Sequence, residues 1–84
     1  MIVHIEADCE PQRDGVLARA VRVGVAQVGI DEGDAIRALR TTVLAWCHGL
    51  AAVDSLEAAL GQRRIEWDAG GGAIDVVVTP IPRG

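Results

Sequence analysis

Residues 36–60, IRALRTTVLAWCHGLAAVDSLEAAL, carry the most regular pattern in the chain. Apolar side chains recur in this run at steps of three or four, at Ile36, Leu39, Val43, Trp46, Leu50, Val53, Leu56 and Leu60. This spacing predicts an amphipathic helix with one buried face. Asp31, Glu32 and Asp34 precede the run, and carboxylates stabilise the positive end of a helix. The helix is therefore expected to begin at Asp31.

Two features argue against one unbroken helix over residues 34–60. Gly49 weakens a helix interior, and Asp54-Ser-Leu-Glu57 resembles a capping box that would start a new helix. We expect a break near Val53 and a short further helix that ends at Gly61. A single long helix, as in a coiled coil, is the alternative.

The chain opens with an alternating pattern. Over residues 2–7, Val3, Ile5 and Ala7 fall on one face of an extended chain, and the residues between them fall on the other. Such alternation predicts a β-strand with one buried face.

The stretch from Arg13 to Gly29 predicts a first helix. Apolar residues follow one another there at intervals of four, four and three, at Leu17, Val21, Val25 and Val28. This spacing is helical. Pro11 suits the first turn of such a helix, and Gly29 suits its C-terminal cap.

A second apolar strip on this predicted helix consists of Val16, Ala20 and Val23, and its narrow polar edge consists of Arg19 and Arg22. A helix that is apolar on two sides needs two surfaces to pack against. One surface would be the domain's own sheet. The other is expected to belong to a partner.

The last third of the chain predicts a β-hairpin. Apolar and polar residues alternate over residues 65–69 and again over residues 74–79, and residues 69–72 supply a glycine-rich turn. Pro80 and Pro82 end the final strand because proline cannot donate to a sheet.

These elements together predict a single small domain over residues 1–84 with a two-layer α+β fold. It would contain a three-stranded, largely antiparallel sheet with two main helices on one face, in the order β-α-α-β-β.

Composition narrows the function classes. Half of the 84 residues are apolar, a surplus for so small a domain, and this predicts self-association or a binding role. The net charge of -4 and the absence of a basic cluster disfavour nucleic acid and anionic membranes as partners. The apolar runs are shorter than the roughly 18 residues needed to span a bilayer, and the acidic start does not resemble a signal peptide. A cytoplasmic location is expected.

The order of these elements and the run Arg40-Thr-Thr-Val resemble the N-terminal half of the anti-sigma-factor serine kinases, which have the histidine-kinase-like ATPase fold. In that family a Glu that activates water and an Asn that holds magnesium follow this run. Ala45 and Gly49 stand at the matching positions, and neither can do that chemistry. The family's adenine-binding Asp-x-Gly is replaced by Pro80-Ile-Pro82. The resemblance therefore implies a scaffold without ATPase or kinase residues, with no cofactor and no catalytic residue.

The same resemblance implies a partner. The family forms dimers through its N-terminal strand and first helix, and Arg19 matches a position that contacts a sigma factor. We therefore expect a homodimer that regulates a protein partner, with a sigma factor or its antagonist as the candidate, through Arg19, Arg22, Val16 and Val23. The alternative is a small structural assembly subunit of a phage or compartment, or an antitoxin-like chain.

Cysteine and histidine give no competing site in the sequence. Cys47 and His48 are neighbours on a helix and point about 100° apart, so they do not form a nucleophile and its base. Cys9 and His4 do not have the local spacing of zinc ligands. No metal site is predicted, Cys47 is expected in the core, and His48 is expected on the surface.

Overall fold

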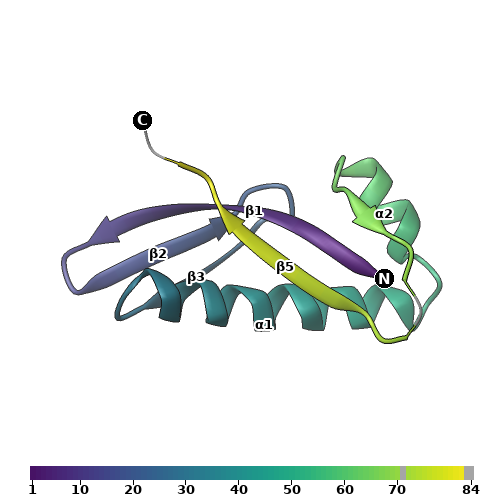
Figure 1. Ribbon diagram of the computed structural model, residues 1–84, viewed down its shortest axis with the longest axis horizontal. Coiled ribbons are helices and arrows are strands. Elements are labelled where there is room, and N and C mark those ends of the chain that lie inside the picture. The colour runs from purple at the N-terminus through teal and green to yellow at the C-terminus, as the bar shows by residue number, and fades with distance from the viewer. Residues whose placement is uncertain (71, 83–84) are drawn as a thin grey trace.

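The computed structural model of the chain describes residues 1–70 and 72–82, which form seven helices and strands (Figure 1). In chain order they are β1 (Ile2–Gln12), β2 (Gly15–Ala20), β3 (Val25–Gly29), α1 (Glu32–Ala51), α2 (Leu56–Gln62), β4 (Trp67–Asp68) and β5 (Asp75–Pro80). The fold is α+β with topology βββααββ, so the predicted order β-α-α-β-β is wrong.

β1 organises a five-stranded sheet in the order β3-β2-β1-β4, with β5 also paired to β1. Residues 8–12 of β1 pair antiparallel with β2, which pairs antiparallel with β3. Ile2 and Val3 pair antiparallel with β4, and residues 2–7 pair parallel with β5. Since β4 and β5 both pair with Ile2 and Val3, they lie on opposite edges of β1.

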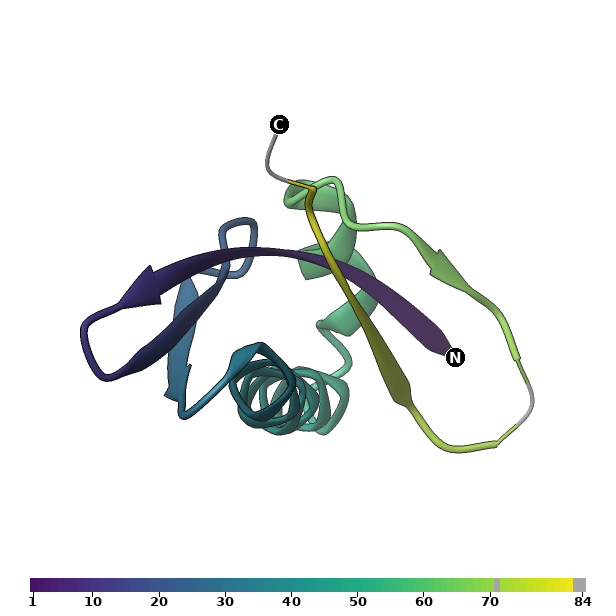
Figure 2. The same cartoon turned by 60° about the vertical axis from the view of Figure 1, so that its left-hand side comes forward.

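The sheet curves around α1, which lies in its concavity (Figure 2). The core is built from small and branched side chains and a few leucines, and its largest fully buried members are Leu39, Leu60, Val3, Val43, Val76 and Cys47. Val3, Ile5 and Ala7 of β1 all face this core, which confirms the predicted first strand and its buried face.

The helix predicted from residues 36–60 is confirmed, together with its break. Asp31 is the N-cap of α1, and its carboxylate accepts a hydrogen bond of 2.8 Å from the N–H of Asp34. α1 runs through Gly49 and ends at Ala51, and α2 follows as a separate short helix. Of the two predicted main helices, only the second is present: α1 corresponds to it, and α2 corresponds to the short further helix after its break.

The helix predicted over residues 13–29 is wrong. This stretch forms the turn between β1 and β2 and then the strands β2 and β3. Its valines suit strands, since β-branched side chains pack well on a pleated sheet. The two apolar strips of the predicted helix are divided among the two sheet faces and the turn between β2 and β3. Pro11 pairs with Val16 in the β1–β2 ladder and does not open a helix.

The predicted C-terminal hairpin is also wrong, because β4 and β5 do not pair with each other. They flank β1, whose N-terminal half is free to pair because β2 joins it only from Asp8 onward. Local alternation identified extended chain but not its distant partner. Gly71, in the predicted turn, lies outside the described residues.

Two glycines allow the first turn of α1 to lie against β3. A Cβ on Gly29 would come within 2.3 Å of the backbone nitrogen of Ala35, and a Cβ on Gly15 would come within 2.2 Å of the carbonyl oxygen of Gly29. Real side chains cannot approach backbone atoms so closely, and Ala35 is fully buried at this point. Gly29 is thus required for close packing and does not cap a helix.

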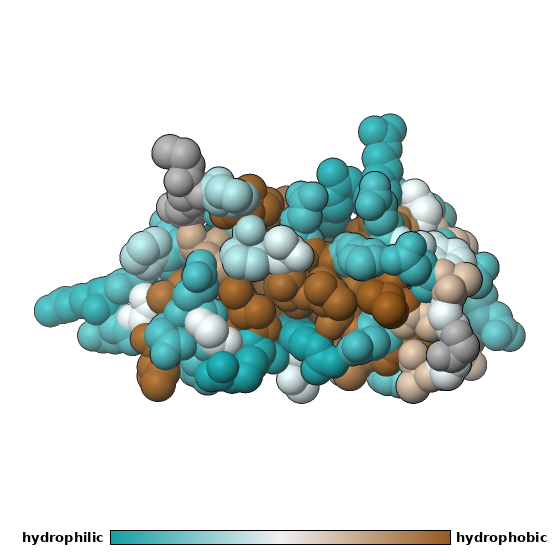
Figure 3. All heavy atoms as spheres, viewed as in Figure 1, coloured by the Kyte–Doolittle hydropathy of each residue, from teal (hydrophilic) through white to brown (hydrophobic). Residues whose placement is uncertain are grey.

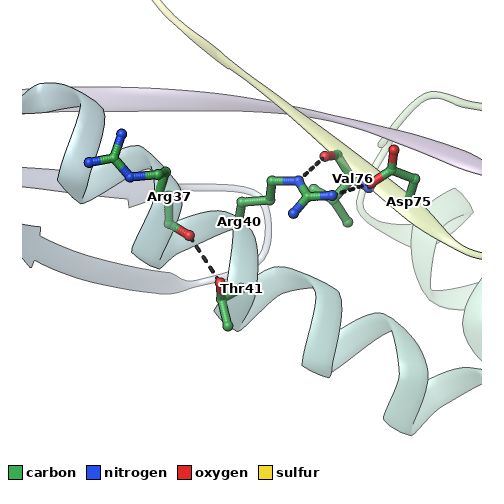
Figure 4. A network of polar contacts seen from close by, with 5 residues as sticks. All are labelled: Arg37, Arg40, Thr41, Asp75 and Val76. Atoms are coloured by element: carbon green, nitrogen blue, oxygen red, sulfur yellow. Dashed lines mark hydrogen bonds and ion pairs between the residues drawn. The ribbon is translucent and has the colours of Figure 1, made fainter.

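A polar network holds β5 to α1 (Figure 4). Arg40 donates from Nε to the carbonyl oxygen of Val76 over 2.9 Å, and its Nη2 contacts the carboxylate of Asp75. The Asp75 carboxylate also accepts from the N–H of Val76 over 2.9 Å. The hydrogen bond from Arg40 and then the bond from Val76 lower the pKa of Asp75 below its ordinary value.

We expect Gly29→Ala to destabilise the fold by about 1–3 kcal/mol or more, because the new methyl group must displace the backbone of Ala35. Gly49→Ala is the matched control. Gly49 is exposed on α1, and a Cβ added there would have no atom within 4 Å apart from the adjoining backbone of its own helix, so the same change should stabilise by about 0.5–1 kcal/mol. Thermal unfolding followed by circular dichroism measures both, and equal signs would contradict the packing argument.

The Arg40–Asp75 contact predicts a pH dependence. Since the pKa of Asp75 is lower in the folded than in the unfolded chain, its contribution is complete above the unfolded pKa and disappears as the pH falls through the folded value. Asp75→Asn should therefore lower the melting temperature slightly at neutral pH and not in strong acid. Parallel melts of both proteins across the acid range test this, and a pH-independent difference would argue against the contact.

Candidate functional site

The four residues predicted to bind a partner do not share one face in the structure. Val16 and Arg19 lie on β2, and Arg22 and Val23 lie in the turn between β2 and β3. Val16 packs against the core, whereas Arg19 is exposed on the sheet face turned away from α1, called here the outer face. Only Arg22 and Val23 line one common hollow.

The positions that match ATPase and adenine-binding residues in the resembled kinases also lie apart from this hollow. Ala45 and Gly49 are one turn apart on the exposed side of α1. Pro80 is the last residue of β5. None of these positions is among the residues that line the hollow.

The hollow, called here the β1 hollow, has a volume of about 320 Å³. It lies beside a stretch of β1 that pairs with neither β2 nor β4. β2 pairs with β1 from Asp8 onward and β4 pairs at Ile2 and Val3, which leaves residues 4–7 of β1 between the two paired segments. The lining of the β1 hollow combines apolar and charged side chains. It consists of His4, Ile5, Glu6, Ala20, Arg22, Val23, Arg64, Ile65, Glu66 and Thr79.

Arg22 connects the two walls of the β1 hollow. Its Nη1 donates to the carbonyl oxygens of Arg63 (3.3 Å) and Arg64 (3.1 Å), directly after α2. A cation is favourable at the C-terminal end of a helix, where carbonyl groups lack partners. The Arg63 guanidinium in turn lies 5.5 Å from the ring centre of Trp46 on α1. Arg22 therefore ties the β2–β3 turn to the helical layer.

Arg64 occupies a backbone position that favours glycine. Its φ of 56° is left-handed, the N–H of Ile65 donates to the carbonyl of Leu60 over 2.9 Å, and the N–H of Arg64 donates to the carbonyl of Gly61 over 3.2 Å. This is the Schellman arrangement that ends a helix, in which glycine is the usual left-handed residue. Arg64 is at the same time one of the residues that line the β1 hollow.

The outer face carries charges beside an apolar patch. Arg19 lies between Asp8 (3.8 Å) and Glu10 (3.7 Å), which face it from β1. Next to them on the adjoining strands, Leu17 of β2 is paired with Val28 of β3.

The β2–β3 patch, as it is called here, consists of Leu17, Val28 and Ile30. Val28 is 62% exposed, and Ile30, directly after β3, is 82% exposed. The sequence signal for this patch is the alternation of Val28, Gly29 and Ile30, which the helical interpretation hid.

Cys47 and His48 do not form a nucleophile and its base. Cys47 is fully buried, and this burial raises the pKa of its thiol, so the reactive thiolate is disfavoured. His48 beside it is exposed, as expected from their positions on a helix. Across residues 1–70 and 72–82, no group of three His, Cys, Asp or Glu side chains is placed to hold a metal ion.

In the described part of the chain, no helix combines the length and apolar character needed to cross a bilayer. Comparisons with protein-family models, with curated proteins and with solved structures gave no match to this chain.

Proposed function

We propose that the chain is a non-catalytic, regulatory protein-binding domain that acts in the cytoplasm as a homodimer and engages a second protein. The observation that carries this proposal is the β2–β3 patch, where Val28 and Ile30 are largely exposed beside Leu17. Single exposed apolar residues are normal on a protein surface, but adjacent large ones indicate an interaction site.

The energetics support a partner at this patch. Full burial of an exposed Val or Ile side chain contributes about 1.5–3 kcal/mol, so covering Val28 and Ile30 offers a substantial gain. Arg19, Asp8 and Glu10 lie beside the patch and would form a polar rim. An apolar centre with a polar rim is the usual anatomy of a protein interface.

A role without catalysis or cofactor is supported by the chemistry of the side chains. The thiol of Cys47 is buried and its pKa is raised. The lowered pKa of Asp75 disfavours that carboxylate as a proton donor near neutral pH. The Cys47 thiol is thus a poor nucleophile, and the Asp75 carboxylate is a poor general acid.

The identity of the partner has less support. The proposal that the partner is a sigma factor or its antagonist rests on the run Arg40-Thr-Thr-Val alone. The other support for the family resemblance was the predicted element order, and the fold has a different order. A structural assembly subunit or an antitoxin-like chain is the second candidate. α1 runs through Gly49 without a break, and this favours the second candidate, because a long unbroken helix at this place is what a structural assembly subunit is expected to have.

A photo-crosslinking amino acid in place of Ile30 should capture a specific protein in host cells, because Ile30 is the most exposed apolar side chain of the patch. The same amino acid in place of the exposed Ala58 on α2 is the control. Adducts are identified by mass spectrometry. Identical adducts at both positions, or none at Ile30, would refute the patch as the binding site.

Millimolar ATP with magnesium should leave the melting temperature unchanged, since a ligand that binds the native state must raise it. The measurement is a thermal shift titration with nucleotide-free protein as reference. A concentration-dependent rise would contradict the non-catalytic, cofactor-free proposal.

A further inference from the structure

One edge of β5 has no strand beside it in the described chain. The N–H groups of Asp75 and Ile81 donate to Met1 (2.9 Å) and Ala7 (2.8 Å), which places them on the β1 side. Backbone groups alternate along a strand, so those of Val76 and Val78 face the opposite, open edge. An open edge with unpaired backbone groups is a template for another strand.

The backbone groups on this edge are not equivalent. The carbonyl of Val76 is held by Arg40, and its N–H is held by the Asp75 carboxylate (Figure 4). The N–H and C=O of Val78 face the open edge, where the described chain places no strand. Pro80, next in the alternation, offers a carbonyl but has no N–H.

An apolar strip accompanies the open edge. Ile36, Arg40 and Leu44 are spaced four apart on α1 and so share one flank, and Arg40 identifies that flank as the one beside β5. Ile36 and Leu44 are only half-buried, as is Val78. Figure 3 shows apolar side chains gathered across the middle of this face, above a hydrophilic border.

We infer that this edge pairs with β5 of a second copy of the chain, antiparallel about a two-fold axis at Val78. The inference rests on the proposed homodimer and names its interface. In this register each Val78 exchanges both backbone hydrogen bonds with the partner's Val78. The N–H of Val76, released by Asp75, donates to the carbonyl of the partner's Pro80.

The pattern of donors and acceptors selects this register. Pro80 lacks the N–H that would otherwise reach the carbonyl of Val76, and that carbonyl is already satisfied by Arg40. If Val76 faced Val78, the carbonyl of Val76 would have to accept from Arg40 and from the partner's Val78 at once. If Val78 faced Pro80, the carbonyl of Val78 would have no donor. The register centred on Val78 gives every backbone group on the edge a partner without asking the Val76 carbonyl to accept a second bond.

Side-chain packing agrees with a second copy. In this register Val77 faces the partner's Thr79, and Val78 faces its own counterpart, pairs of β-branched residues that suit a sheet. The two-fold axis keeps both α1 helices on the same face of a continuous sheet, where Ile36 and Leu44 of each copy come toward those of the other. An unrelated strand with an N–H opposite Val76 would have to share the Val76 carbonyl with Arg40, whereas Pro80 of a second copy has no N–H to place there.

Val78→Pro tests the interface. The N–H of Val78 faces away from β1, so its removal costs no hydrogen bond inside the chain, and proline is tolerated on edge strands. Size-exclusion chromatography with light scattering should find a dimer for the wild type and a monomer for Val78→Pro, with a dimer dissociation constant raised on the order of a hundredfold. Val28→Lys, which alters the β2–β3 patch and not the edge of β5, should remain dimeric.

A second measurement covers the case in which Val78→Pro does not fold. In a dimer of labelled and unlabelled wild-type chains, filtered NMR should detect a contact between the Hα of Val77 and the Hα of the partner's Thr79. Their Cα atoms would be about 4.5 Å apart. Within one strand the same two residues are roughly 6.6 Å apart and give no such signal.

The outcomes separate the two proposals. A wild-type dimer without the Val77–Thr79 contact, or with a folded and dimeric Val78→Pro, overturns the β5 interface and leaves the homodimer. A wild type that is monomeric at high concentration overturns the homodimer and the interface together. Crosslinking of β5 to a foreign strand in place of a second copy also overturns the inference.

Discussion

The closeness of α1 to β3 is the constraint on which the other contacts depend. Gly29 brings the backbone of Ala35 within reach of the strand, and Gly15 allows β2 to follow. From this point α1 crosses the concave sheet and buries Leu39 and Val43 against it. Its far flank then carries Arg40 to β5. A looser first turn would shift every later contact of the helix, because packed interiors transmit such displacements.

Sequence patterns predicted the elements with long or simple signals. The run from Ile36 to Leu60 contains enough turns for a helical period to be unambiguous, and Asp31 marks its start. Residues 13–29 are different, because short strands joined by a tight turn can imitate a helical spacing. Gly24, with φ of 85° between β2 and β3, is the residue that could have revealed the turn.

The candidate site could not be predicted in the same way, because its parts meet only through the fold. Arg22 reaches the carbonyl of Arg64 across 42 positions of sequence, and Ile5 forms the floor between them. No local spacing encodes this contact. Val28 and Ile30 were visible as apolar residues, but their exposure follows from the strand that replaced the predicted helix. Because a helix was predicted in place of strands, the prediction of which side chains are exposed was wrong as well.

The parallel pairing of β1 with β5 joins Ile2 to Asp75. During synthesis, the first strand leaves the ribosome long before the segment that completes its edge. Until β5 emerges, Val3 and Ile5 lack part of their cover, and closing so long a loop slows folding. The nascent chain thus passes through a stage with an incomplete core, in which a chaperone would find its apolar first strand accessible.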